Sequence, residues 1–327
     1  MMAIEIVEDI DSHEWDEFLG NSSEATGFHT KEWIDAIVET YPNRRPLYII
    51  ARDSQKKIAG GMPVIDVSRF GIHNYVAMPF GTYGWPIIRD DASESVREDI
   101  LAEIERFSRG WNVGLTRIVS LRKLVLPGFR ATDAYTHILP LSQDAEAVWN
   151  SMGGKTRNQC RKANQSGVIV ELENSSDAFC KYYNMYVESA RRWGRRSPPY
   201  PWSLFANLQR RADMGRIKLW LAKINGEPVA GALCFYGTTE VIWWSGAMFA
   251  QYSKVCPNNA LQRAIIEHAC QRGYRSYNMG GSGDLEGVRR FKEGFGAKRL
   301  DYQVYERERT IYRAYAIAHK LLRKRSE

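Results

Sequence analysis

The chain has 327 residues, a net charge of +7 and a hydrophobic fraction of 44%, values typical of a globular protein with two domains. The absence of a long apolar run or a signal-peptide profile argues against a membrane span or secretion, and five scattered cysteines without Cys-x-x-Cys spacing argue against disulfides or zinc. We therefore expect a cytoplasmic protein without a metal, whose positive charge permits a polyanionic partner.

The first half of the chain has a mixed α/β pattern. Strands are expected at residues 4–7, 47–51, 58–67, 116–121 and 135–139, and helices at 11–19, 30–41 and 93–108. Asp11 is a suitable N-cap for the first helix, and Pro42 ends the second. The aromatic, glycine-rich run at 78–88 (MPFGTYGWPII) predicts a partly exposed strand or loop.

The second half repeats this order. Helices are expected at 155–165, 176–193, 258–272, 285–293 and 309–325, with another ending near Arg211. Strands are expected at 168–172, 217–224, 228–236, 239–245 and 275–279. Asn225-Gly226 predicts a tight hairpin turn. A shift of 171 residues places residues 48–52 on 219–223 and 58–61 on 229–232 without a gap, which indicates a duplication or a chance similarity between two hairpins.

A glycine-rich turn stands out near the C-terminus, in residues 277–298 (YNMGGSGDLEGVRRFKEGFGAK). The strand before it breaks at Gly280-Gly281, and a short helix follows. Glycines let the backbone take positive φ and approach a ligand closely, and a helix start offers free N–H groups to an anion or oxyanion. The alternative is a plain connector between a strand and a helix.

This string resembles the C-terminal signature of the FemX/FemA/FemB transferases, read as Tyr-Asn-x-Gly-Gly, a gap, then Gly-Val-x-x-Phe-Lys-x-x-Phe-Gly. Residues 257–273 and the basic stretch 155–167 (KTRNQCRKANQSG) are similar to further parts of that family. The resemblance implies an α/β (α+β) fold of two tandem GNAT-like modules with mixed sheets, the acyl-CoA N-acyltransferase fold. We expect the modules at 1–145 and 146–308, followed by a basic C-terminal helix at 309–327.

The family resemblance also implies an activity, the transfer of an amino acid from aminoacyl-tRNA to an amine, which forms a peptide bond. The acceptor would be a peptidoglycan precursor or a small peptide, with possible contact to a membrane-linked precursor. Such a reaction must orient its reactants, move a proton and stabilise an oxyanion. Candidate residues are Lys292 for the oxyanion, Asp284 or Tyr277 (or the leaving hydroxyl) for the proton, and Phe291, Gly280 and Gly281 for the donor.

The basic helix adds candidates for donor binding. Lys155, Arg157, Arg161 and Lys162 occur within eight residues without an acidic residue between them. Arg157 and Arg161 share one face, and such a cluster suits phosphate. The alternative is a solvated helix face. Arginines around Trp193, followed by a proline-rich loop, suit stacking on bases or a surface loop held by prolines.

The acceptor is expected between the modules, against the aromatic run at 78–88. Tyr83, Trp85 and Arg89 are the candidate acceptor-binding residues, because the run has too many glycines for a simple core strand.

The expected strand–helix connection at 248–259 contains no glycine, although GNAT enzymes that use acyl-CoA hold its pyrophosphate on a glycine-rich loop there. We therefore expect no bound cofactor, with aminoacyl-tRNA as co-substrate and acetyl-CoA less favoured. Two alternatives stay open: an acyl-CoA-dependent N-acyltransferase of the FemAB-related type in exopolysaccharide or cell-envelope metabolism, and a non-catalytic basic RNA-binding protein.

Overall fold

The computed structural model describes residues 3–283 and 285–309 and divides into two compact units. Unit 1 comprises Met1–Ala134 together with Asp301–Glu327, and unit 2 comprises Tyr135–Leu300. The expected modules, 1–145 and 146–308, have different limits, because both unit boundaries fall inside strands. The expected basic helix at 309–327 lies almost entirely outside the described residues. Among the described helices, none combines the length and apolar character needed to cross a bilayer.

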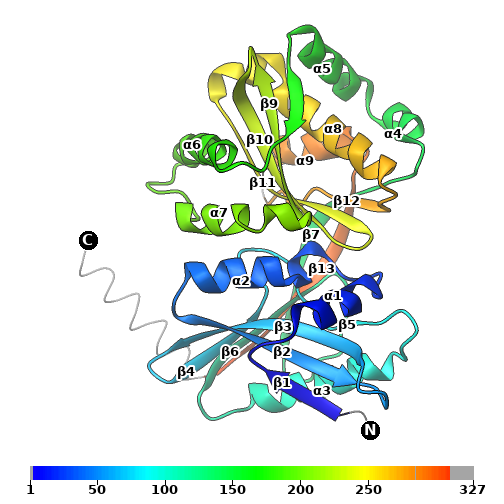
Figure 1. Ribbon diagram of the computed structural model, residues 1–327, viewed down its shortest axis with the longest axis vertical. Coiled ribbons are helices and arrows are strands. Elements are labelled where there is room, and N and C mark those ends of the chain that lie inside the picture. Colours follow the sequence, from blue (N-terminus) through cyan, green and yellow to red (C-terminus); the bar gives the residue numbers. More distant parts are fainter. Residues whose placement is uncertain (1–2, 284, 310–327) are drawn as a thin grey trace. The chain divides into compact units, whose positions relative to one another are not determined.

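Unit 1 is a mixed sheet with helices on both faces (Figure 1). Its strands follow the order β1-β2-β3-β4-β6-β13, in which β4 and β6 are parallel and the other neighbours antiparallel. The bounds are β1 Ala3–Val7, β2 Arg44–Arg52, β3 Ile58–Arg69, β4 Ile72–Ala77, β5 Ile87–Ile88, β6 Val113–Ser120, β13 Lys298–Glu308, α1 Ser12–Gly20, α2 Lys31–Thr40 and α3 Ser95–Ser108.

Unit 2 repeats this arrangement. Its strands follow the order β8-β9-β10-β11-β12-β7, in which β11 and β12 are parallel and the other neighbours antiparallel. The bounds are β7 Arg130–Pro140, β8 Ile169–Leu172, β9 Ile217–Ile224, β10 Glu227–Tyr236, β11 Glu240–Met248, β12 Ser276–Asn278, α4 Ala145–Ser151, α5 Gly154–Gln165, α6 Ser176–Arg192, α7 Trp202–Gln209, α8 Pro257–Gln271 and α9 Glu286–Gly294.

The last strand in each order comes from the other half of the chain. β7 follows the strands of unit 1 in sequence, yet its residues Ile138–Pro140 pair with β12 of unit 2. β13 follows the strands of unit 2, yet its residues Gln303–Glu308 pair with β6 of unit 1. The chain therefore passes from one unit to the other within these two strands.

The two central hairpins match as the internal comparison predicts, with one correction. Ala51 pairs with Gly60 in unit 1, and Ala222 pairs with Ala230 in unit 2. The first strands are thus related by a shift of 171 residues and the second strands by 170. The ungapped comparison was therefore wrong for the second strand, and a slip of one residue matters because it turns every side chain to the opposite face.

With this correction, Gly61 corresponds to Gly231, and both glycines make room for an aromatic ring. A Cβ at Gly61 would lie 2.8 Å from the indole of Trp15 in α1, and a Cβ at Gly231 would lie 2.6 Å from the ring of Tyr182 in α6. The neighbouring Gly60 faces Val96 of α3 instead. Helices therefore cover both faces of the sheet at this point.

The core of unit 2 lies on the other face of β10. Its alternate residues Ala230, Ala232 and Cys234 pack with Leu261 and Ile265 of α8. This alternation follows from the period of two in a strand, and it places α6 and α8 on opposite faces of the sheet (Figure 1). The same core reaches the glycine-rich turn, because Met279 and Phe295 belong to it.

Candidate active site

The glycine-rich turn follows β12, as the sequence predicts, and hydrogen bonds hold it on the side of β7. Gly280 takes φ of 75° and Gly283 takes φ of 51°, a region that glycine enters without strain. The side-chain oxygen of Asn278 accepts hydrogen bonds from Gly280 N at 3.0 Å and from the hydroxyl of Thr136 at 2.7 Å. Tyr135 Oη donates to Gly283 O at 2.6 Å. The turn is thus fixed against β7 rather than free.

Lys292 points back from α9 into this turn. Its Nζ donates to the carbonyl oxygens of Gly280 at 2.8 Å and Gly281 at 2.6 Å, and the residue is only 3% exposed. Burial lowers the pKa of Lys292 to about 8. An ammonium group has three protons to donate, so one remains for a further acceptor. The structure brings together Lys292, Gly280 and Gly281 from the set of candidate residues.

Phe291 packs beside these residues. Its ring lies 5.2 Å from that of Phe295 and 6.4 Å from that of Trp243 in β11, and Lys292 Nζ lies 5.9 Å from the centroid of the Trp243 ring. Phe291 is partly exposed. A half-buried ring of this kind can still offer one side to a donor, so its assignment stays a prediction.

His137, which the sequence analysis did not single out, lies at the same turn. It belongs to β7, and its backbone bonds both Met279 N and Gly280 O, at 2.8 and 3.2 Å. Its Nδ1 lies 3.3 Å from the hydroxyl of Ser282. The two residues are 145 positions apart, so no spacing in the sequence links them. Strand pairing alone brings them together.

Tyr277 does not fit the role of proton acceptor. It is completely buried, and its hydroxyl donates to Gln262 Oε1 at 2.7 Å. Burial raises the pKa of Tyr277 well above that of an ordinary phenol. The burial of Tyr277 could not be predicted from the sequence, because the strands that pair with β12 decide which of its faces meets the core. Asp284, the other candidate, lies outside the described residues.

The basic helix α5 contacts α9 through its first turn. Gly153 N donates to Gly294 O at 2.9 Å, at the end of the helix that carries Lys292. Lys155, Arg161 and Lys162 are exposed, whereas Arg157 is partly buried. Arg161 and Arg263 both lie over the ring of Trp149, at 5.6 and 4.3 Å. Exposed cations are therefore available on α5.

The candidate acceptor residues are engaged within unit 1. Tyr83 is 3% exposed and Trp85 is 4% exposed. The ring of Tyr83 packs against Phe28 and Tyr302, and that of Trp85 against His29. This burial corrects the expectation that both side chains contact an acceptor, because a ring packed on its own unit has little surface left for a ligand.

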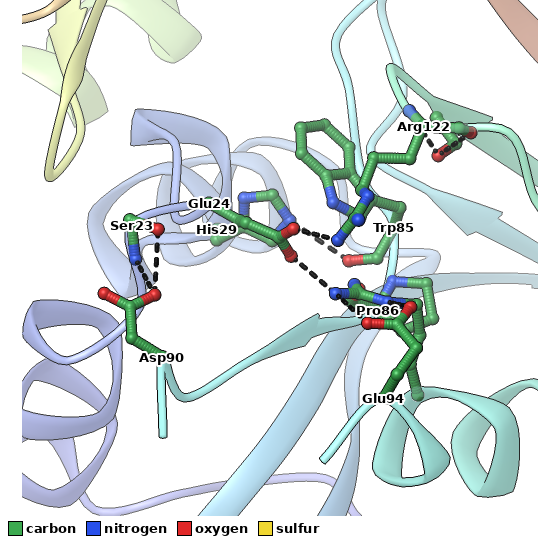
Figure 2. Close-up of polar contacts among 10 residues, drawn as sticks. Ser23, Glu24, His29, Trp85, Pro86, Asp90, Glu94 and Arg122 are labelled. Carbon is green, nitrogen blue, oxygen red and sulfur yellow. Dashed lines mark hydrogen bonds and ion pairs between the residues drawn. The ribbon is translucent and has the colours of Figure 1, made fainter. Parts of the chain in front are cut away.

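Arg89 is paired rather than free, since its guanidinium contacts Asp53 at 3.2 Å and also bonds Asp91. Figure 2 shows the polar contacts around Trp85: its carbonyl accepts from His29 Nε2 at 3.2 Å, and the nearby Asp90 accepts from Ser23 N and Oγ, both at 2.8 Å. The bond from His29 to Trp85 ties the run at 78–88 to unit 1, and the others fix the residues that follow this run.

The connection from β11 to α8 has no glycine-rich loop. It contains a 3₁₀ helix, Ala250–Val255, and α8 then begins at Pro257. Proline has no N–H group, and the preceding Cys256 takes φ of 57°. The first turn of α8 thus offers fewer donors than a glycine-rich loop would. In the described part of the chain, no cluster of His, Cys, Asp and Glu is suited to a metal ion.

Comparisons with known proteins give the class of protein. Residues 151–293 match the model of the acetyltransferase (GNAT) domain family. Together with the repeated sheets, this match gives an acyltransferase with a tandem GNAT fold, and the α/β fold predicted from the sequence is confirmed.

Among solved structures, the chain is similar to FemX, with a TM-score of 0.73 and 13% identity over 91% of this chain and 96% of that one. The predicted resemblance to the FemX group is thus confirmed in the fold. The L-PGS structure from Bacillus licheniformis has a TM-score of 0.57 and 14% identity over 99% of this chain and 100% of that one.

A tandem GNAT protein from the clavulanic acid biosynthesis pathway has a TM-score of 0.54 and 11% identity over 94% of this chain and 98% of that one. No curated protein matches the sequence.

Proposed function

We propose that this acyltransferase is an aminoacyltransferase. It would move an amino acid from the ester of an aminoacyl-tRNA to an amine, such as that of a peptidoglycan precursor or a small peptide. Since the donor ester is already activated, the protein has to orient the two reactants, accept a proton and stabilise the oxyanion. Charged tRNA is a cytoplasmic substrate, so we expect the protein to act there, with the acceptor free or linked to a membrane.

The observation that carries this proposal is the start of α8. A pyrophosphate at this position needs backbone N–H donors, and Pro257 removes one of them where the helix begins. The similarity of this chain to FemX in fold and the exposed cations of α5 favour a tRNA donor. Lys292 Nζ, with one proton left, is the candidate donor to the oxyanion at the Gly280-Gly281 turn.

A donor of the acyl-CoA type is the second candidate. The specific observation in its favour is the family match over residues 151–293, which is described as an acetyltransferase domain. A CoA-dependent enzyme would need another cradle for the pyrophosphate, because the connection at 248–259 contains no glycine.

The deciding experiment offers both donors to the purified protein. tRNA charged with radiolabelled amino acids, or labelled acetyl-CoA, is incubated with a mixture of amine acceptors, and the label in free donor and in amide product is followed. We expect discharge of aminoacyl-tRNA that depends on the acceptor. Consumption of acetyl-CoA with every charged tRNA left intact would overturn the proposal in favour of the second candidate.

A further inference from the structure

One buried side chain at the turn has a polar atom without a partner. His137 has no exposed surface, and its Nε2 makes no hydrogen bond within the described residues. A carboxylate oxygen, Oε1 of Glu293, lies 4.0 Å from this Nε2. Leaving such a group unpaired costs about 1–3 kcal/mol, and each case in a folded protein calls for an explanation. A structural histidine in a core would have both ring nitrogens satisfied, as His29 has.

Burial favours the neutral form of the His137 ring. It is the main cause that lowers the pKa of His137 below 6.5, and the nearby charges of Lys292 and Arg289 act in the same direction, while Glu293 and a hydrogen bond to the Gly280 backbone oppose them. The phenol ring of Tyr135 lies 5.6 Å from the imidazole, edge to face. A neutral imidazole has one N–H and one lone pair. With the proton on Nε2, the lone pair of Nδ1 accepts from the hydroxyl of Ser282.

Ser282 is the member of this pair that lies in the turn itself. It follows Gly281, whose carbonyl is bonded to Lys292, and it precedes Gly283, whose carbonyl is bonded to Tyr135. The hydroxyl therefore belongs to the segment that the proposed oxyanion donor also contacts. His137 lies behind it, on β7.

We infer that Ser282 and His137 form a proton relay that takes the proton from the acceptor amine during acyl transfer. Ser282 touches the amine and is the catalytic residue, whereas His137 acts through it. This inference rests on the proposed function for the existence of an amine acceptor. It does not depend on the choice of donor, because an amine loses a proton whether the acyl group comes from a tRNA ester or from a thioester.

The step is balanced as follows for the ester. The amine nitrogen forms a bond to the carbonyl carbon, and one amine proton passes to Ser282 Oγ while the hydroxyl proton of Ser282 passes to His137 Nδ1. The imidazolium then carries N–H groups on both nitrogens, and Nε2–H faces Glu293. When the C–O bond to the ribose breaks, one proton returns along the same path to the leaving oxygen. The products are an amide and a hydroxyl, and His137 is neutral again.

The test compares the wild type with Ser282→Ala, His137→Gln and Glu293→Gln in single-turnover assays across pH 5–8, using whichever donor the wild type discharges. Ser151→Ala is the control, because that hydroxyl donates to the carbonyl of Val148 in α4. We expect the wild-type rate to rise with pH through a midpoint below 6.5. Ser282→Ala and His137→Gln should lose on the order of a hundredfold in rate with donor binding intact, and His137→Gln should lose the midpoint.

One further variant, Ser282→Thr, and the pH profile of Glu293→Gln exclude a merely structural role. Ser282→Thr keeps the hydroxyl and should retain more activity than Ser282→Ala. Glu293→Gln removes the charge that favours the imidazolium, so the midpoint should move to lower pH. Thermal unfolding of every variant separates loss of folding from loss of rate.

The outcomes that overturn the relay are distinct from those that overturn the function. A wild type that discharges neither donor overturns both. A wild type that turns over, with Ser282→Ala at the same rate or with the midpoint retained in His137→Gln, overturns the relay alone. An acyl group found covalently on Ser282 by mass spectrometry would also overturn it, because the serine would then be a nucleophile.

Discussion

Lys292 Nζ donates to the carbonyl oxygen of Gly281 at 2.6 Å and thereby joins α9 to the turn that ends β12. A lysine on a solvated helix face would tolerate replacement, but this one is 3% exposed and also holds Gly280. Its role is therefore structural as well as electrostatic. Any oxyanion that it meets must accept a hydrogen bond from the one remaining N–H, between a fixed turn and the ring of Trp243.

Replacing Lys292 should lower both stability and rate. We expect Lys292→Ala to reduce the free energy of unfolding by roughly 1.5–3 kcal/mol, since two buried charge-assisted hydrogen bonds are lost, and to slow single turnover by on the order of a hundredfold. Lys292→Arg should be milder in stability but still slow, because a guanidinium does not fit the same acceptors. Denaturation and single-turnover rates at saturating donor measure the two effects. Wild-type turnover in Lys292→Ala would refute the assignment.

Gly61 and Gly231, which occupy corresponding positions in the two units, should not tolerate alanine. Gly61→Ala and Gly231→Ala each force a methyl group against the ring of Trp15 or Tyr182, so we expect each to lower the free energy of unfolding by about 1–3 kcal/mol. Gly287→Ala is the matched control, because a Cβ there meets nothing within 4 Å. Urea denaturation of the three variants is the measurement. Equal urea midpoints for the three variants would contradict the prediction and would mean that the helices shift to make room for the added methyl groups.

His29 should make unit 1 sensitive to acid. Burial lowers its pKa to about 4, whereas in the unfolded chain the pKa is about 6.5. Between these values the unfolded state binds more protons, so stability falls as pH is lowered from about 6.5 to about 4, by roughly 3 kcal/mol when complete. His29→Gln removes this contribution. Urea midpoints of both proteins at pH 7 and pH 4.5 should therefore differ in their pH dependence, and parallel values would contradict it.

Glu240 should have the opposite effect in unit 2. Burial raises its pKa to about 7, against about 4.3 in an unfolded chain. The folded state now binds more protons between these values, so stability falls as pH rises from about 4.5 to about 7. Glu240→Gln should therefore be more stabilising at pH 8 than at pH 5, by roughly 3 kcal/mol. Denaturation at the two pH values tests it; a difference of the other sign would show that the carboxyl is ionised in the folded protein.

The exposed cations of α5 should govern affinity for charged tRNA. Since counterions leave the phosphates when lysine and arginine bind, affinity should fall steeply between low and moderate salt. Charge reversal of Arg161 and Lys162 should weaken binding and flatten the salt dependence; Arg157 is left intact because it is partly buried. Arg106→Glu on α3, an exposed residue of unit 1, is the control. A tRNA affinity that changes neither with salt nor with the two charge reversals would refute the proposal of a nucleic-acid donor.

Local patterns predicted most of the helices and strands to within a few residues. Asp11 caps α1 as expected, and β9 spans Ile217–Ile224 as predicted. The strands β4 and β13 and the short helix α4 were not predicted. β13 has many charged residues and lacks a clear alternation, so its pairing with β6, far away in sequence, decides its structure.

The site was only partly accessible from the sequence. The motif led to Lys292 and the two glycines because these residues are close in sequence and carry a family pattern. Tyr277 and Trp85 were misjudged because burial depends on which face of a strand meets the core. The pairing of His137 with Ser282 could not be predicted, since it arises from the pairing of β12 with β7.

The crossing of β7 and β13 means that the two halves of this chain are not separable parts. A break near Asp144 would leave one fragment holding a strand that belongs to the sheet of the other, and would open β6 and β12 as bare edges ready to recruit foreign strands. Each fragment would carry the piece that completes its counterpart, so the severed halves should re-associate rather than persist alone. For the same reason, neither half can be lost, duplicated or transplanted by a single cut without damaging both sheets.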